Sequence, residues 1–403
     1  MLQLELAGHK IGFEFMLASF EHPKLKRPSR GRIEDPFKTG APLDRRQILK
    51  ASALSSMLAG LGACAQVSSS MAPVNAKGLP AWPTHVQKII FGSCIDQDKP
   101  QPIWETILAA KPDLFIFGGD NVYASRQPWQ LHNLEKAYAA QAAQPGFAAL
   151  RASIPHLAIW DDHDMGLNDG GVEFPHKQDA KNAFVDFWQL PSDDPRKTRP
   201  GLYHAHVFGP PGQRVQVVLL DTRWFRSKLR VTDQRNAPGK ERYVPDADPQ
   251  KTMLGEAQWA WLETQLKVPA EVRLIVSGVQ VIVEGHGWEG WGNFPREQEK
   301  LKRLIQKTGA KGVVLLSGDR HIGAIYKSSV TEGYPLYEIT SSGMTHAWAT
   351  AKEDGPNRLG ELITQNHFGL IEMDWSKQQI QLGFQNTRGE WLKKQTIALS
   401  ELR

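Results

Sequence analysis

Short apolar runs, rich in β-branched and aromatic residues, recur along the chain from about residue 82 onward. Their length and composition are typical of buried strands. The predicted strands are 86–91, 114–117, 156–160, 215–220, 274–276 and 313–316. Between many of them the apolar residues follow the helical period, which predicts helices at 103–110, 180–189, 254–266 and 296–307. This alternation predicts an α/β protein with a layered sheet covered by helices.

The pattern changes towards the C-terminus. Predicted strands at 336–340, 369–375, 379–384 and 396–399 have only loops between them, which favours a closing antiparallel sheet. No long linker divides 82–403, so we expect one domain there. No apolar run reaches about 18 residues, which excludes a protein with several membrane spans.

The net charge of +5 is concentrated at the N-terminus. Residues 1–50 carry ten Lys and Arg against six Asp and Glu, whereas 51–403 carry 38 against 37. Because the rest of the chain is nearly neutral, we expect no nucleic-acid partner. The basic patch is followed by an uncharged run at 51–64 and a Ser-rich segment. This order predicts an export leader at 1–64 and a linker at 65–81, with an amphipathic helix as the alternative.

The leader contains two further motifs. Arg45-Arg46 resembles the twin-arginine motif, which implies the twin-arginine export machinery as a partner. Leu61-Gly62-Ala63-Cys64 resembles a lipobox, so either Cys64 is lipidated or cleavage occurs downstream. We therefore expect an exported monomer in the periplasm or at the cell surface, which contacts a membrane only through a lipid anchor.

Polar clusters follow four of the predicted strands directly. They are Gly92-Ser93-Cys94-Ile95-Asp96, Gly118-Gly119-Asp120-Asn121-Val122-Tyr123, Asp161-Asp162-His163-Asp164 and Ser317-Gly318-Asp319-Arg320-His321. Ligands bind outside the carboxyl ends of strands in α/β folds. Carboxylates gathered there repel one another unless cations lie between them. Each cluster alone could be a turn or a helix cap, but four together predict a metal site.

The ordered motifs GSC, GGDNVYA, WDDHD and SGDRH resemble the PhoD-like (alkaline phosphatase D) branch of the calcineurin-type metallophosphatases, from about Gln87 to His321. The resemblance implies a four-layer α/β/β/α sandwich with two metals, which hydrolyses phosphate esters through in-line attack by a metal-bound hydroxide. No Gly-x-Ser-x-Gly elbow or Walker-type loop is present, in agreement with such chemistry.

The resemblance also implies individual roles. Asp120 would bridge both metals, Cys94 and Tyr123 would bind Fe³⁺, and Asp319 and His321 match a pair of metal ligands. Asp162 and Asp319 stand where relatives carry Asn and His, which shifts the second site towards Ca²⁺, with Zn²⁺ or Mn²⁺ as alternatives at this centre. The histidine expected after the penultimate strand is absent, and Gln280 either takes its place or is an ordinary strand-end residue. The catalytic histidine is His163, and the residues expected to contact substrate are Asn121, Arg223 and Arg320.

Several assignments stay open at this stage. Arg223 could bind a phosphate oxygen or a neighbouring carboxylate. Trp288, Trp291 and Trp348 could form the rim of the pocket or lie buried under long loops. The predicted function is hydrolysis of phosphomonoesters or phosphodiesters. The alternatives are a phospholipase D-like or nuclease-like phosphodiesterase, and a surface lipoprotein without activity on the same scaffold.

Overall fold

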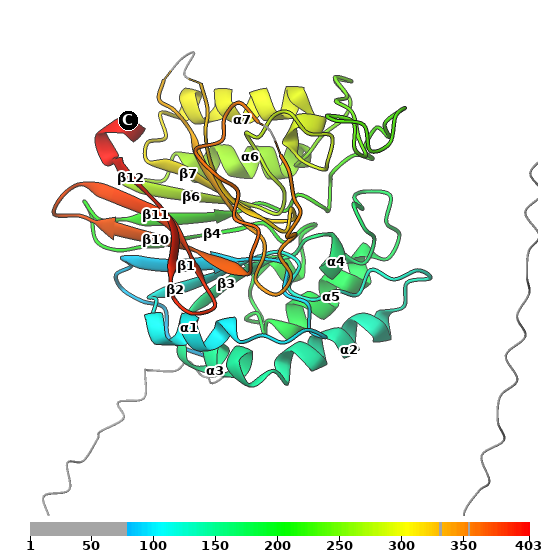
Figure 1. The fold of residues 1–403 in the computed structure, drawn as a ribbon, viewed down its shortest axis with the longest axis horizontal. Helices are drawn as coiled ribbons and strands as arrows, with labels where there is room; N and C mark the ends of the chain where they lie inside the picture. The colour runs from blue at the N-terminus through cyan, green and yellow to red at the C-terminus, as the bar shows by residue number, and fades with distance from the viewer. Residues whose placement is uncertain (1–78, 330–332, 354) are drawn as a thin grey trace, which may run out of the picture. The chain divides into compact units, whose positions relative to one another are not determined.

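The computed structural model describes residues 79–329, 333–353 and 355–403. Two six-stranded sheets pack face to face, with helices on both outer sides, so that four layers result (Figure 1). The order in the first sheet is β12-β11-β10-β1-β2-β3, and in the second β4-β5-β6-β7-β9-β8. The predicted four-layer α/β/β/α sandwich is therefore confirmed. The leader residues Arg45, Arg46 and Cys64 lie outside the described residues.

The first sheet combines parallel and antiparallel strands. Its members are β1 (Lys88–Gly92), β2 (Leu114–Gly118), β3 (His156–Ile159), β10 (His367–Asp374), β11 (Gln379–Asn386) and β12 (Trp391–Ala398). Strands β1, β2 and β3 run parallel, and β10 to β12 continue the sheet in antiparallel register. The helices on this side are α1 (Ile103–Ala110), α2 (Leu131–Ala142), α3 (Pro145–Ser153), α4 (Asp162–Met165) and α5 (Lys177–Phe187) (Figure 1).

The second sheet has a parallel centre and antiparallel edges. It contains β4 (His204–Phe208), β5 (Val215–Leu219), β6 (Val272–Ser277), β7 (Val313–Ser317), β8 (Gly323–Lys327) and β9 (Tyr337–Ser341). Its outer face is covered by α6 (Gly255–Leu266) and α7 (Pro295–Thr308) (Figure 1). Three 3₁₀ turns complete the described elements: Pro195–Lys197, Trp291–Asn293 and Leu399–Leu402.

All six predicted buried strands and all four predicted helices are present within a few residues of the expected bounds. The expected C-terminal sheet needs correction, because 336–340 belongs to β9. This strand pairs with β7 in parallel in the second sheet, whereas β10 to β12 extend the first. An apolar run specifies a strand but not its partner, so the sequence pattern could not separate the two sheets.

The first sheet is anchored by an aromatic cluster under α1 and α3. Phe117 lies 4.5 Å from Phe115, 5.6 Å from Phe147 and 4.7 Å from Trp188, measured between ring centroids. Trp104 of α1 closes the cluster at 5.8 Å from Phe115. Offset and edge-to-face contacts of this kind add to the free energy gained from burial. They fix β2, whose carboxyl end carries Asp120.

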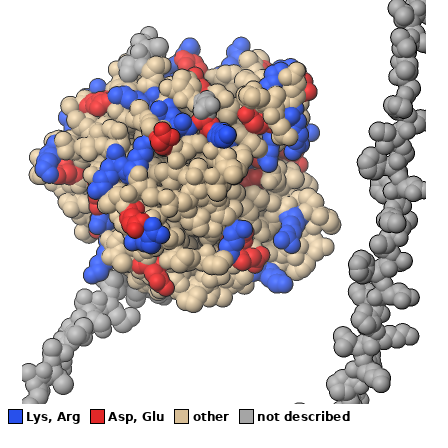
Figure 2. Space-filling view, in the orientation of Figure 1, with Lys and Arg blue, Asp and Glu red and all other residues tan. Residues whose placement is uncertain are grey.

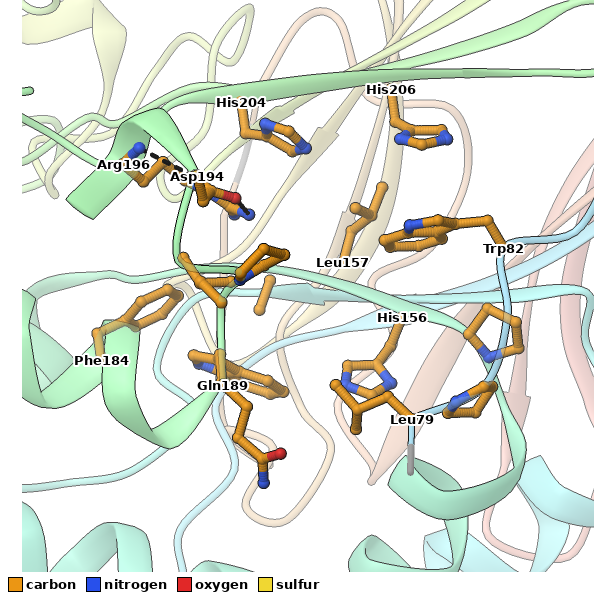
Figure 3. A pocket seen from close by; sticks show the side chains of 16 residues that line it. Leu79, Trp82, His156, Leu157, Phe184, Gln189, Asp194, Arg196, His204 and His206 are labelled. Carbon is orange, nitrogen blue, oxygen red and sulfur yellow. Dashed lines mark hydrogen bonds and ion pairs between the residues drawn. The ribbon is translucent and has the colours of Figure 1, made fainter. Parts of the chain in front are cut away.

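A cavity of about 430 Å³ opens where edge strands β3 and β4 face each other (Figure 3). His156 and Leu157 come from β3, and His204 and His206 come from β4 on the opposite side. Trp82 also lines the cavity, with its ring 4.8 Å from that of His206. We call this space the edge cavity. None of the four polar motifs contributes a side chain to its lining.

Charged side chains of both signs are interspersed over the face of the molecule in view (Figure 2). This agrees with the near-neutral composition of 51–403. Among the described residues, no helix is both long enough and apolar enough to cross a bilayer.

Candidate metal centre and active site

The four polar motifs meet at one edge of the sandwich, as the strand pattern predicts. Ligand atoms of Cys94, Asp120 and His321 all lie within 4.8 Å of one another, and so do those of Asp120, Asp162 and His163. A third group within the same limit contains Asp162 and Asp319, together with Asp161. Asp120 takes part in two of these groups. Its carboxylate is therefore placed where one residue could serve two cations.

The backbone at these positions is strained. Cys94, Asp120, Asp319 and His321 all have positive φ values, between 48° and 69°. The left-handed region costs a residue with a side chain about 1–2 kcal/mol, so the surrounding structure must hold each one. Gly119 shows how tightly the turn before Asp120 is packed, because its φ is 108° and an added Cβ would lie 2.7 Å from the Cβ of Asp161. Strain of this kind concentrates at functional sites.

A thiol, a carboxylate, a phenol and an imidazole converge in the first half of the centre. The Sγ atom of Cys94 lies 3.5 Å from Oδ2 of Asp120, and the hydroxyl of Tyr123 donates to the same oxygen at 3.3 Å. The Tyr123 hydroxyl is also 3.1 Å from Nε2 of His321. Burial, followed by the charge of Asp120, raises the pKa of Cys94, and burial also raises that of Tyr123. Both groups need a nearby cation to lose their protons, which a metal would supply.

The second half of the centre is a set of buried carboxylates. Asp162 accepts the backbone N–H of Asp169 at 2.6 Å through Oδ2, while its buried Oδ1 has no partner among the described residues. Burial raises the pKa of Asp120, and Asp162 adds to the effect. Burial also raises the pKa of Asp319, with Glu289 as the next cause. Oxygen ligands that are packed, buried and partly unpaired fit a hard cation.

His163 lies at the mouth of this centre. Its Nδ1 is 2.6 Å from the hydroxyl of Ser125, and its ring lies 4.2 Å from the ring of Tyr123. Ser125 therefore fixes the orientation of the imidazole from the loop after β2. The sequence analysis did not identify Ser125, because a serine in a loop carries no signal of its own.

Arg223 is not at the surface of the cleft, contrary to its predicted contact with substrate. The residue is fully buried, its Nε donates to Asp161 at 2.5 Å, and its Nη1 donates to Glu289 at 2.7 Å. Two carboxylates bind Nε and Nη1 of the guanidinium, and the buried Nη2 has no partner among the described residues, so Arg223 supports the loop that carries Asp161. The sequence alternative, pairing with a neighbouring carboxylate, describes it better.

Asn121 and Gln280 also need correction. Asn121 is fully buried and donates through Nδ2 to the Ile159 carbonyl at 2.9 Å and to Asp164 at 3.0 Å, so it cannot reach a substrate. Gln280 donates from Nε2 to Tyr326 and Thr340 at 3.1 Å each, and its Oε1 lies 2.9 Å from Nε2 of His286. With both ends of its amide engaged, Gln280 is a buried structural residue and not a metal ligand.

A cleft of about 260 Å³ leads to the centre. It is lined by Asp162, His163, Asn168, Asp169, Arg242, Trp288, Glu289, Asp319, Arg320, His321 and Trp348. The predicted residue Arg320 is therefore in place, as are the rim candidates Trp288 and Trp348. Trp291, in contrast, is buried and packs edge-on against Trp259 at 6.1 Å.

Asp169 and Glu289 are site residues that the sequence analysis missed. Asp169 accepts from Arg242 and Tyr243 at 2.7 Å each, and it forms a possible ligand group with Asp162 and Glu289. Neither residue directly follows a predicted strand. Their place in the cleft depends on long loops, which carry no periodic pattern.

Two facing sheets with outer helices, and a cluster of acidic residues and histidine at one edge, define the metallophosphatase type of structure. The chain matches the description "PhoD-like phosphatase" over residues 90–384, and it belongs to that family.

Individual proteins similar to this chain are also phosphatases. The chain is 23% identical over 225 residues to alkaline phosphatase D of Bacillus subtilis (strain 168), in an alignment that covers 51% of this chain and 37% of that protein. A solved structure of PhoD superposes with a TM-score of 0.62 at 17% identity, covering 81% of this chain and 73% of the other. For a purple acid phosphatase from yellow lupin (Lupinus luteus) seeds, the TM-score is 0.51 at 13% identity, with 79% and 55% covered. At these identities the structures show a shared fold.

Proposed function

We propose that this protein is a metal-dependent phosphoric ester hydrolase. The observation that carries the proposal is the position of Asp120, which shares ligand groups with Cys94 and His321 on one side and with Asp162 on the other. Membership in the PhoD-like phosphatase family supports it. The mixed sulfur, nitrogen and oxygen ligands of the first group suit iron, and the oxygen ligands of the second suit Ca²⁺.

The bound cations would clamp the phosphoryl oxygens and activate water for attack on phosphorus. The roles of the side chains follow from their positions. His163 faces the cleft, where it would either donate a hydrogen bond to the phosphoryl group or protonate the leaving oxygen, while its Nδ1 contacts Ser125. Arg320 lines the cleft beside Asp319 and adds positive charge near the departing group.

Elemental analysis, combined with an ester assay, tests this proposal. We expect purified protein to contain iron and calcium, and to hydrolyse p-nitrophenyl phosphate or its bis-ester until a chelator removes the metal. Loss of the iron absorbance in Tyr123→Phe would identify the phenol as an iron ligand. Absence of hydrolysis of either ester by metal-replete protein would refute the proposal.

We further propose that the N-terminal segment directs export. Its support is the sequence order of Arg45-Arg46, an uncharged run and small residues ending at Cys64. Replacement of both arginines by lysine should keep the protein in the cytoplasm, as measured by cell fractionation. Cys64→Ala should release it from the membrane if Cys64 is lipidated. Export that is unaffected by the lysine pair would exclude the twin-arginine route.

A further inference from the structure

One wall of the cleft differs in chemistry from the carboxylate centre. It contains Trp288, from the loop after β6, and Trp348, from the loop after β9. The two rings meet edge to face, with centroids 5.5 Å apart and planes at 88°. The backbone N–H of Trp348 donates to the carbonyl oxygen of His321 at 2.7 Å. This bond ties the tryptophan loop to a metal-ligand motif, so the wall is held at a fixed position beside the centre.

Two arginines flank these rings. The guanidinium carbon of Arg320 lies 4.7 Å from the centroid of Trp288 and 5.7 Å from that of Trp348. The corresponding distance from Arg242 to Trp288 is 5.0 Å. A carboxylate holds each arginine, since Arg320 pairs with Glu353, and Arg242 donates to Asp169 at 2.7 Å. The arginine side chains are therefore fixed against Trp288.

Trp348 remains available to a ligand. The residue is 36% exposed, which is high for a tryptophan in the lining of a cleft, and its Nε1 is already bonded to Thr350 at 3.0 Å. What it offers to the cleft is mainly its apolar ring surface. The ester group of a substrate whose phosphate lies at the carboxylate centre is the group that would reach this surface.

The flanking charges decide which ester group fits. A pair of tryptophans can bind a quaternary ammonium group, but the guanidinium groups of Arg320 and Arg242 already lie over the Trp288 ring, where such a cation would bind. An aliphatic group gains only from burial, whereas a flat ring also gains from stacked or edge-on contact with an indole. We propose that the cleft selects phosphate esters whose alcohol carries a planar aromatic ring, as in benzyl or nucleoside esters, and that Trp348 determines this specificity. The inference rests on the proposed function of the same site.

Benzyl phosphate and cyclohexylmethyl phosphate form a matched pair of probes. Both are esters of primary alcohols, with six-membered rings at the same distance from phosphorus, so the chemistry of the leaving groups is similar. We expect kcat/KM to be about 3- to 10-fold higher for the benzyl ester, the range given by a single aromatic contact. The preference should disappear in Trp348→Ala and largely persist in Trp348→Phe. Phosphocholine should be a poorer substrate than either ester.

Trp82→Ala serves as the control, because Trp82 is also exposed but lies at the edge cavity. This variant should keep the full preference. Equal kcat/KM values for the two esters, or a preference that survives in Trp348→Ala, would overturn the inference while the proposed function stands.

If the protein hydrolyses neither ester, the specificity can still be tested by binding. Calorimetry would compare the affinities for benzylphosphonate and cyclohexylmethylphosphonate. Tighter binding of the benzyl compound without any hydrolysis would support the specificity and refute the proposed activity, whereas equal binding would refute the specificity as well.

Discussion

The cleft at the carboxylate centre and the edge cavity between β3 and β4 are two hollows in one molecule with opposite properties. The edge cavity is the larger, about 430 Å³ against about 260 Å³, and most of its lining is apolar. The cleft holds buried carboxylates, and four residues other than glycine in the motifs around it have positive φ values. Of these two hollows, size alone would have selected the edge cavity. Buried charge and backbone strain identify the chemical site instead. Both lower the stability of the fold and are not needed to pack the core, so their presence indicates a function.

The two hollows also differ in how their carboxylates are paired with cationic side chains. In the edge cavity, Asp194 and Arg196 pair directly at 2.7 Å, so their charges are balanced by the protein itself. At the centre, Asp120 and Asp162 are buried and Asp319 is half-buried, and none of the three forms an ion pair with a lysine or arginine among the described residues. The missing positive charge must come from outside the chain. Substitutions at the centre should therefore change chemistry, and those at the edge cavity should change stability alone.

The largest effect is expected from Asp120→Asn. The change removes the one carboxylate shared by both ligand groups, so it should lower kcat/KM for a phosphate ester by about a thousandfold or more, which corresponds to several kcal/mol of metal-ion catalysis. The metal content should fall as well, as measured by elemental analysis. Asp194→Asn at the edge cavity is the matched control and should leave kcat/KM unchanged. A full metal complement in Asp120→Asn would contradict the shared role of this residue.

The second-largest effect is expected at Arg223. Substitution of this residue distinguishes a structural role in the site from direct contact with substrate. Arg223→Met leaves Asp161 buried without its ion-pair partner and Glu289 with Arg226 alone, so the free energy of unfolding should fall by about 3–5 kcal/mol. Urea unfolding measures this loss. Arg223→Lys keeps a positive charge and should lose less. A variant that unfolds like the parent protein but has a raised KM would restore the predicted contact with phosphate.

Arg223 also shows what the sequence could and could not predict. The motif residues Cys94, Asp120, Asp162 and His321 were found because each follows a buried strand within a few residues, and strand ends are fixed by the sheet. Arg223 follows β5 in the same way, yet its side chain points into a layer of carboxylates. Sequence position gives the edge at which a residue lies, but not whether its side chain faces solvent or the neighbouring loop.

Elements with weak periodicity were missed for a related reason. Helix α2 (Leu131–Ala142) is not among the helices predicted from the sequence, since its four buried residues include only two large apolar side chains, Leu134 and Tyr138. The buried residues do recur at intervals of three and four, but the other two are Ala137 and Gln141, which contribute little to a hydrophobic pattern. Asp169 and Glu289 carry even less signal, because loops place them and only the folded chain brings them to Asp162.

The smallest predicted effect belongs to the edge cavity and its response to pH. Burial lowers the pKa of His204 to about 3, and the Arg196 guanidinium contributes to the shift. The unfolded chain, with an ordinary histidine pKa of about 6.5, binds this proton first as the pH falls. Since the unfolded state then holds more protons, stability present above pH 6.5 is lost progressively as the pH falls towards 3.

At pH 5.5 the loss from His204 should be about 1 kcal/mol relative to pH 7.5. Asp194 and His206 also face this imidazole, with Asp194 favouring its charged form and His206 opposing it. The test is urea unfolding of the parent protein and of His204→Gln at both pH values. The variant should show a smaller difference between them, while kcat/KM for a phosphate ester at pH 7.5 stays at the parent value. Equal pH dependence in the two proteins would show that His204 is not held neutral by burial, whereas a loss of activity would show that the edge cavity and the cleft are not independent.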